Sequence, residues 1–197
     1  MRLLKFFIDT EFIEDGKTID LVSIGIVCEN GASYYAISTE FNPIKASHWV
    51  VDNVLAKLPP VPIGKFPQTI SSDSFWQPDT FDPLDPSVLP DITAEASCWK
   101  SRKAIALEVV DFIEKQCAGA NPEFWGYYAD YDWVVFCQLF GTMMDLPNRF
   151  PMYCRDIKQE CDRLGNPEIP KQESGEHNAL ADAFWNKQAW EFLNAIC

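Results

Sequence analysis

The stretch Leu3-Leu4-Lys5-Phe6-Phe7-Ile8-Asp9-Thr10-Glu11-Phe12 consists mainly of large apolar side chains and carries two acids near its end. Such a run is typical of a strand buried at the centre of a sheet. Two further β-rich runs follow at 19–28 and 32–39. Asn30-Gly31, between these two runs, indicates a hairpin because both residues tolerate positive φ. We therefore predict three successive antiparallel strands.

The remainder of the chain alternates between helical and extended patterns. Helices are predicted at 48–58, from a cap at Thr93 to Cys117, and at 131–143, 156–164 and 179–195, with strands at 123–129 and 152–154. Three strands followed by this alternation predict an α/β fold, in which helices pack on a mixed sheet of antiparallel and then parallel strands.

The segment 59–92 has a different composition from the rest of the chain. Eight of the 14 prolines lie between Pro59 and Pro90, together with four aromatic residues. Because proline removes backbone donors and breaks helices, we predict a loop or insertion within a single domain that spans 1–197. Its aromatic side chains either pin the loop to the domain or form a stacking surface for a base or a partner.

Composition excludes several classes of protein. With 197 residues, 47% hydrophobic and 23% charged, the chain has material for a packed core and is not of the disordered class. It lacks an apolar run of about 18 residues and a signal-peptide pattern, so we expect a cytoplasmic protein without a membrane partner. The seven cysteines include no CxxC pair, which favours reduced thiols.

The net charge of −13, from 29 acidic and 16 basic residues, restricts the ways in which the chain could bind nucleic acid. Proteins that hold a duplex by neutralising many phosphates are normally basic. The charge therefore argues against an architectural or sequence-reading binder. It does not argue against an enzyme that binds metal through carboxylates and lets the metal meet the phosphate.

Five residues form a candidate site. Asp9 and Glu11 are two apart on the first strand and share one face near its C-terminal end; such a pair is costly unless a cation lies between the two acids or water already reaches them. Asp132 stands where the fourth strand gives way to a helix. His177 precedes Asp182 by five residues, so the two cannot share a helix face, and His177 is expected on the loop before the last helix.

The combination of Phe7-Ile8-Asp9-Thr10-Glu11-Phe12, Tyr131-Asp132 and His177 with Asp182 resembles the DEDDh group of 3′-to-5′ exonucleases, of the ribonuclease H-like fold. The motifs occur in the order of that family and span positions 9 to 182. The phrases at 125–133 and 177–183 are most similar to a compact stand-alone exoribonuclease branch. Asp130 is an alternative second-motif acid, and Asp132 is favoured because the aspartate of that family usually follows an aromatic residue.

The resemblance implies a two-metal mechanism. Asp9, Glu11 and Asp182 would bind one Mg²⁺ or Mn²⁺, Asp9 would bridge to a second ion, and Asp132 would reach that ion through water. His177 would be the general base, and the product would be a nucleoside 5′-monophosphate. The substrate would be the 3′ end of a single strand, with RNA favoured over DNA by the branch resemblance alone.

Other functions stay open from the sequence. One is a 3′-to-5′ exodeoxyribonuclease, and another is a catalytically silent module that binds nucleic acid or protein on the same fold. A homodimer is also left open. An aspartyl-phosphate phosphatase is disfavoured because Glu11 stands where an Asp-x-Asp motif needs its second aspartate.

Overall fold

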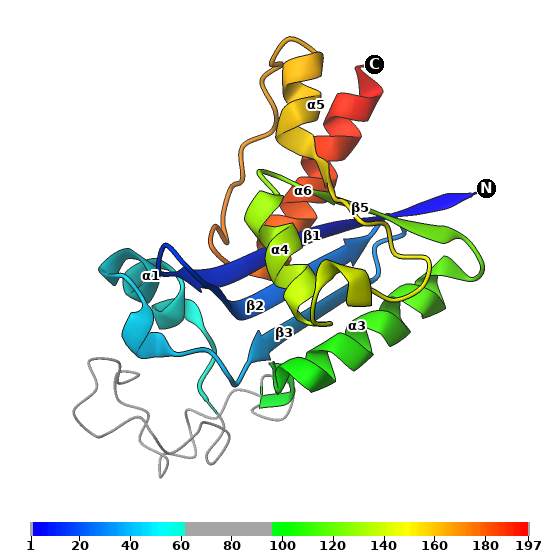
Figure 1. Cartoon of the computed structure of the whole chain (residues 1–197). Coiled ribbons are helices and arrows are strands. Elements are labelled where there is room, and N and C mark those ends of the chain that lie inside the picture. The colour runs from blue at the N-terminus through cyan, green and yellow to red at the C-terminus, as the bar shows by residue number, and fades with distance from the viewer. Residues whose placement is uncertain (1, 62–95, 197) are drawn as a thin grey trace, which may run out of the picture.

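A six-stranded mixed sheet organises the computed structural model, which describes residues 2–61 and 96–196 (Figure 1). The strand order is β4-β3-β2-β1-β5-β6. The strands are β1 (Leu3–Glu14), β2 (Ile19–Cys28), β3 (Ser33–Ser38), β4 (Trp99–Lys100), β5 (Asn121–Gly126) and β6 (Arg155–Asp156). β1, β2 and β3 pair antiparallel, whereas the β3–β4, β1–β5 and β5–β6 pairs are parallel. The predicted α/β fold with a mixed sheet is confirmed.

Helices cover both faces of this sheet (Figure 1). They are α1 (His48–Asn53), α3 (Arg102–Cys117), α4 (Asp130–Gln138), α5 (Ile157–Arg163) and α6 (Ala179–Ala195). Short 3₁₀ turns are η1 (Pro43–Lys45), η2 (Leu55–Lys57), η3 (Ala96–Cys98) and η4 (Met143–Asp145). One buried cluster joins the sheet to α3 and α4, and a second joins it to α5 and α6.

β1 lies inside the sheet, between β2 and β5, and its side chains pack alternately into the two clusters. Phe6 and Ile8 pack in the cluster with α3, and Phe7 packs in the cluster with α6. Because side chains alternate along a strand, Asp9 and Glu11 follow Phe7 onto the α6 face. The acids lie in the middle of β1, which continues to Glu14, and not near its end as predicted.

The helix predicted from Thr93 was wrong in its first part. Thr93 lies outside the described residues, while Trp99 belongs to strand β4 and α3 begins at Arg102. The Ser101 side chain caps α3 by accepting a hydrogen bond from the Ala104 amide. Trp99 is buried and stacks on Phe41, so its apolar spacing reflected strand burial and not a helix face.

Several other boundaries differ from the predictions by a few residues. α1 ends at Asn53 and η2 follows it, and α4 ends at Gln138, before the capping box at Thr142 that starts η4. The strand predicted at 152–154 is β6 at Arg155–Asp156. The predicted 59–92 insertion lies almost wholly outside the described residues. Among the helices that are described, none is long and apolar enough to cross a membrane.

Candidate active site

The parallel pairing of β5 with β1 ends before the acids of β1 are reached. The two strands pair only from Leu3–Asn121 to Phe7–Trp125, so the next residues of β1 have no strand on that side. Side chains from two helices bond to the freed backbone groups instead: Asn186 Nδ2 donates to the Ile8 carbonyl at 2.9 Å, and the Thr10 amide donates to Asp132 Oδ1 at 2.8 Å. Open α/β sheets bind ligands at the carboxyl ends of parallel strands, and Asp9 and Glu11 follow the carboxyl end of the β1–β5 pairing.

Asp132 reaches β1 from the first turn of α4. Its Oδ1 accepts from the Thr10 hydroxyl at 2.6 Å as well as from the Thr10 amide, and the residue is 7% exposed. Burial raises the pKa of Asp132 to about 6, against the opposing effect of the Thr10 hydrogen bonds. Asp130, the alternative second-motif acid, is exposed. The structure therefore directs Asp132, and not Asp130, toward Asp9 and Glu11.

Gly25 allows α6 to approach the sheet. It pairs with Asp9 across the ladder, and a Cβ at Gly25 would lie 2.2 Å from the Ala179 carbonyl oxygen. Asn178 caps the helix at this point, because its Oδ1 accepts from the amides of Leu180 and Ala181. The backbone of the first α6 turn thus rests on β2 beside Asp9. The contact of Gly25 with α6 was not predicted from the sequence, although an isolated glycine inside a strand is a known sign of close backbone approach.

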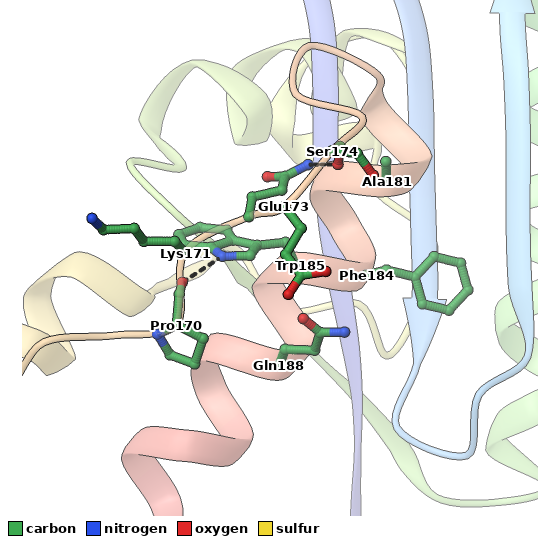
Figure 2. Close-up of a pocket in the computed structure, with 9 residues that line it drawn as sticks. Pro170, Lys171, Glu173, Ser174, Ala181, Phe184, Trp185 and Gln188 are labelled. Atoms are coloured by element: carbon green, nitrogen blue, oxygen red, sulfur yellow. Dashed lines mark hydrogen bonds between the residues drawn. The ribbon is translucent and has the colours of Figure 1, made fainter.

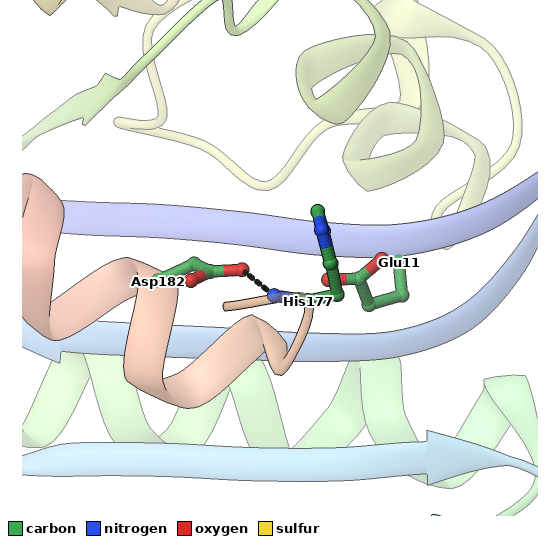
Figure 3. Close-up of side chains that lie close together, drawn as sticks. All are labelled: Glu11, His177 and Asp182. Atoms are coloured by element: carbon green, nitrogen blue, oxygen red, sulfur yellow. Dashed lines mark hydrogen bonds between the residues drawn. The ribbon is translucent and has the colours of Figure 1, made fainter. Parts of the chain in front are cut away.

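The close approach of α6 brings together Glu11, His177 and Asp182, whose candidate ligand atoms lie within 4.8 Å of one another (Figure 3). His177 lies on the loop before α6 and has a φ of 65°, a left-handed backbone conformation that residues other than glycine rarely adopt. Its backbone amide donates to Asp182 Oδ2 at 3.0 Å, and Gln172 Nε2 donates to Asp182 Oδ1 at 2.6 Å. Gln172 was not among the predicted site residues.

Asp9 and Asp132 lie outside that group of three but belong to the same electrostatic cluster. Burial, and then the charges of Asp132, Asp182 and Glu11, raise the pKa of Asp9 well above its usual value. Burial and the charges of Asp182 and Asp132 raise the pKa of Glu11 to about 8, with Lys57 opposing them. Burial also raises the pKa of Asp182. The site thus holds four carboxylates with too little positive charge around them.

This donor set fits divalent cations. Hard cations such as Mg²⁺ and Mn²⁺ prefer carboxylate oxygens, and buried like charges are costly unless a cation compensates them. The pKa values of the four acids are raised because burial and neighbouring negative charges disfavour their ionised forms, which a divalent cation would stabilise. His177 adds a group that can accept a proton beside them.

A pocket of about 450 Å³ lies between α6 and the loop that precedes it (Figure 2). Its lining comes from the loop and from one side of α6, and consists of Pro170, Lys171, Gln172, Glu173, Ser174, Ala181, Phe184, Trp185 and Gln188. The Trp185 indole donates to the Pro170 carbonyl at 2.9 Å, which fastens the start of the loop to α6. Gln172 therefore belongs both to the pocket wall and to the surroundings of Asp182.

Comparison with known proteins gives a consistent result. The profile of the 3′-5′ exoribonuclease Rv2179c-like domain matches residues 88–194. Two 3′-5′ exoribonucleases of Mycobacterium tuberculosis, MT2234.1 of strain CDC 1551 / Oshkosh and Rv2179c of strain ATCC 25618 / H37Rv, are each 36% identical to this chain over 181 residues. Each match covers 91% of this chain and 87% of the relative.

Among solved structures, the yeast NOT1 MIF4G domain co-crystallized with CAF1 gives a match that covers 97% of this chain and 79% of the matched chain. The identity is 10% and the TM-score is 0.40, so this likeness is too weak to indicate a shared function.

Proposed function

Because this chain belongs to the Rv2179c-like 3′-5′ exoribonuclease family, we propose that it shortens single-stranded RNA from the 3′ end by metal-dependent hydrolysis. Membership of the family makes the chain a 3′-5′ exoribonuclease. The observation that carries the metal-dependent mechanism is the cluster of Asp9, Glu11, Asp132 and Asp182, all with raised pKa values, beside His177.

The metal ligands that we propose follow from the positions of the four acids. Asp9 and Glu11 of β1 and Asp182 of α6 would hold one Mg²⁺ or Mn²⁺. Asp9 would also bind a second ion, together with Asp132. Asp132 already accepts two hydrogen bonds from Thr10 on Oδ1, which suits a ligand that acts through water. Bound divalent cations supply the charge that neutralises a phosphodiester and the acidity that activates water.

His177 is the proposed general base of this reaction. Its imidazole lies beside the Glu11 carboxylate, on the loop that precedes α6 (Figure 3). It would take a proton from the water that attacks the phosphorus of the last phosphodiester. The bond from phosphorus to the 3′ oxygen breaks, and that oxygen leaves as the 3′ hydroxyl of the shortened strand after gaining a proton. The product is a nucleoside 5′-monophosphate.

The experiment uses 5′-labelled single-stranded RNA and DNA of matched sequence, with Mg²⁺, Mn²⁺ or EDTA, and the Asp9→Asn variant as control. A ladder that shortens from the 3′ end of RNA, and that needs both metal and Asp9, is the expected result. Faster shortening of DNA would reverse the proposed sugar preference. No cleavage of either strand with any metal would favour the silent binding module.

Location and assembly stay predictions from the sequence. We propose a cytoplasmic protein, and gel filtration with light scattering would test the homodimer that the sequence leaves open.

A further inference from the structure

We infer that Trp49 and Lys57, from α1 and η2, clamp the His177 loop in the position from which its imidazole reaches the carboxylates. The inference rests on the proposed function, in which that imidazole exchanges a proton with the attacking water. Trp49 and Lys57 are then positioning residues, since they act through His177 and not on the substrate.

The loop needs support from outside. Residues 173–176, Glu-Ser-Gly-Glu, are exposed and belong to no helix or strand. His177 follows them with a φ of 65°, a conformation that is costly for a non-glycine residue and persists only when surrounding contacts impose it. Contacts on this loop therefore decide whether the imidazole stays beside the carboxylates.

From the α6 side, two hydrogen bonds hold the loop. The His177 amide donates to Asp182, and Gln172 donates to the other oxygen of the same carboxylate. Both bonds end on the Asp182 carboxylate, one from the loop backbone at His177 and one from the Gln172 side chain. Neither of them fixes the direction of the imidazole ring.

From the opposite side, the indole of Trp49 contacts the ring itself. The two ring centroids lie 4.7 Å apart with an interplanar angle of 79°, an edge-to-face arrangement. Such aromatic pairs are favourable beyond the area that they bury. Trp49 is 54% exposed, so it is not a core side chain that meets His177 only in passing.

Lys57 provides the second contact of the clamp. Its Nζ donates to the carbonyl of Glu176, the residue just before His177, at 3.3 Å. The same ammonium group opposes the rise of the Glu11 pKa, which places its charge near the carboxylates. Lys57 therefore ties the His177 loop to the edge of the acidic cluster.

The base of the clamp is rigid. Val54 and Leu55, between Trp49 and Lys57, are each 1% exposed and pack in the cluster that contains Trp99. The Ser47 side chain caps α1 by accepting from the Val50 amide. A clamp built on a packed core can hold an exposed loop, whereas two mobile elements could not position each other.

The test compares Trp49→Ala, Trp49→Phe and Lys57→Met with two controls, Tyr153→Ala and Lys115→Met. Tyr153 is 58% exposed and Lys115 lies in the last turn of α3, and both are outside the clamp. The readouts are kcat and KM on single-stranded RNA, and hydrogen exchange of peptides covering 172–178 in the absence of RNA.

Trp49→Ala should lower kcat about 10- to 100-fold with KM within about twofold, because misplacement of a catalytic group acts on the chemical step. It should also speed exchange in 172–178, while Trp49→Phe should restore most of both properties. Lys57→Met should shift both readouts in the same direction by a smaller factor. The controls should match the wild type.

Two results would overturn the clamp. A raised KM with unchanged kcat would show that Trp49 contacts RNA and does not position His177. Unchanged exchange in 172–178 would show that the loop does not depend on α1 and η2. If the wild type itself fails to degrade RNA, the proposed function fails, and hydrogen exchange still decides the clamp.

Discussion

Glu11 bears the combined effect of burial and of the charges of Asp182 and Asp132, which together raise its pKa to about 8. A carboxyl that remains protonated at neutral pH in the folded chain, and is ionised in the unfolded chain, binds its proton more tightly in the folded state. A divalent cation in the same place would take over the role of that proton. Proton and cation should therefore compete for this residue.

The first prediction concerns stability without metal. Between pH 4.5 and about 8 the folded state binds more protons at Glu11 than the unfolded state, so the unfolding free energy should fall as pH rises. The expected slope is on the order of 1.4 kcal/mol per pH unit from this group. Chemical denaturation in EDTA at several pH values measures it.

The Glu11→Gln variant is the control for this prediction, because it should lose the share of the slope that Glu11 contributes and keep the share of the other buried acids. Saturating Mn²⁺ should also flatten the slope in the wild type by compensating the ionised acids. A metal-free wild type whose stability rises over the same pH window would contradict the pKa assignment.

The second prediction separates Asp132 from Asp130, two acids in one turn of α4. Asp132→Asn keeps an oxygen for the Thr10 hydrogen bonds but removes the charge, so metal affinity should fall about 10- to 100-fold with the fold intact. The exposed Asp130→Asn should behave as the wild type. Calorimetric titration with Mn²⁺ measures both variants, and equal losses in the two would remove the distinction between them.

At the scale of elements, the position of α6 depends on Gly25. The first turn of the helix touches the β2 backbone there, and Asn186, two turns later, donates to the Ile8 carbonyl of β1. These two contacts set the height and the rotation of the helix that carries Asp182. The geometry of the site is therefore a consequence of how closely α6 packs.

The third prediction tests this packing. In Gly25→Ala the new methyl group would meet the Ala179 carbonyl, so the helix must shift, at a cost of about 1–3 kcal/mol or more. Thermal unfolding measures the loss of stability, and the RNA assay should show a larger loss of activity than of fold.

Gly31→Ala is the matched control for Gly25→Ala. The space around Gly31 is open, and its φ of 92° makes backbone strain the only cost of a side chain there. This variant should be mildly destabilised and fully active. If both variants lost activity equally, the close approach at Gly25 would not be what positions α6.

The elements differ in how far the sequence could predict them. The apolar run of β1 and the alternation of its side chains placed Asp9 and Glu11 on one face, and the five-residue spacing placed His177 on a loop before α6. The start of α3 was predicted wrongly because the burial of Trp99 in a strand has the same spacing as a helix face. Gln172 was missed because its role arises only from its contact with Asp182, and Gly25 was missed although its place inside a strand was a local sign of a close backbone approach.

For the whole molecule, the net charge of −13 sets how RNA can be held. Several basic side chains are already paired with acids within the described part of the chain: Lys100 with Glu108, Arg102 with Asp20, Arg155 with Glu123 and Lys158 with Asp162. Such pairing leaves less cationic surface for phosphates, so cations at the carboxylate cluster would have to supply much of the attraction.

The fourth prediction follows from this balance. Single-stranded RNA should bind the His177→Ala variant, in which turnover is slow, only when Mn²⁺ or Mg²⁺ is present, and the dependence of affinity on monovalent salt should be shallow. Fluorescence anisotropy with labelled RNA measures both. Tight binding in EDTA with a steep salt dependence would show that basic side chains hold the strand.

The four carboxylates are the proposed ligands of the divalent cations that hydrolysis needs. The most direct test is a calorimetric titration of metal-free protein with Mn²⁺, comparing the wild type with Asp9→Asn and with Asp130→Asn as control. Asp9→Asn should lose most of its metal binding while its circular dichroism stays that of the wild type, and Asp130→Asn should lose none. Equal Mn²⁺ affinity in the wild type and Asp9→Asn would contradict the ligand role of the cluster.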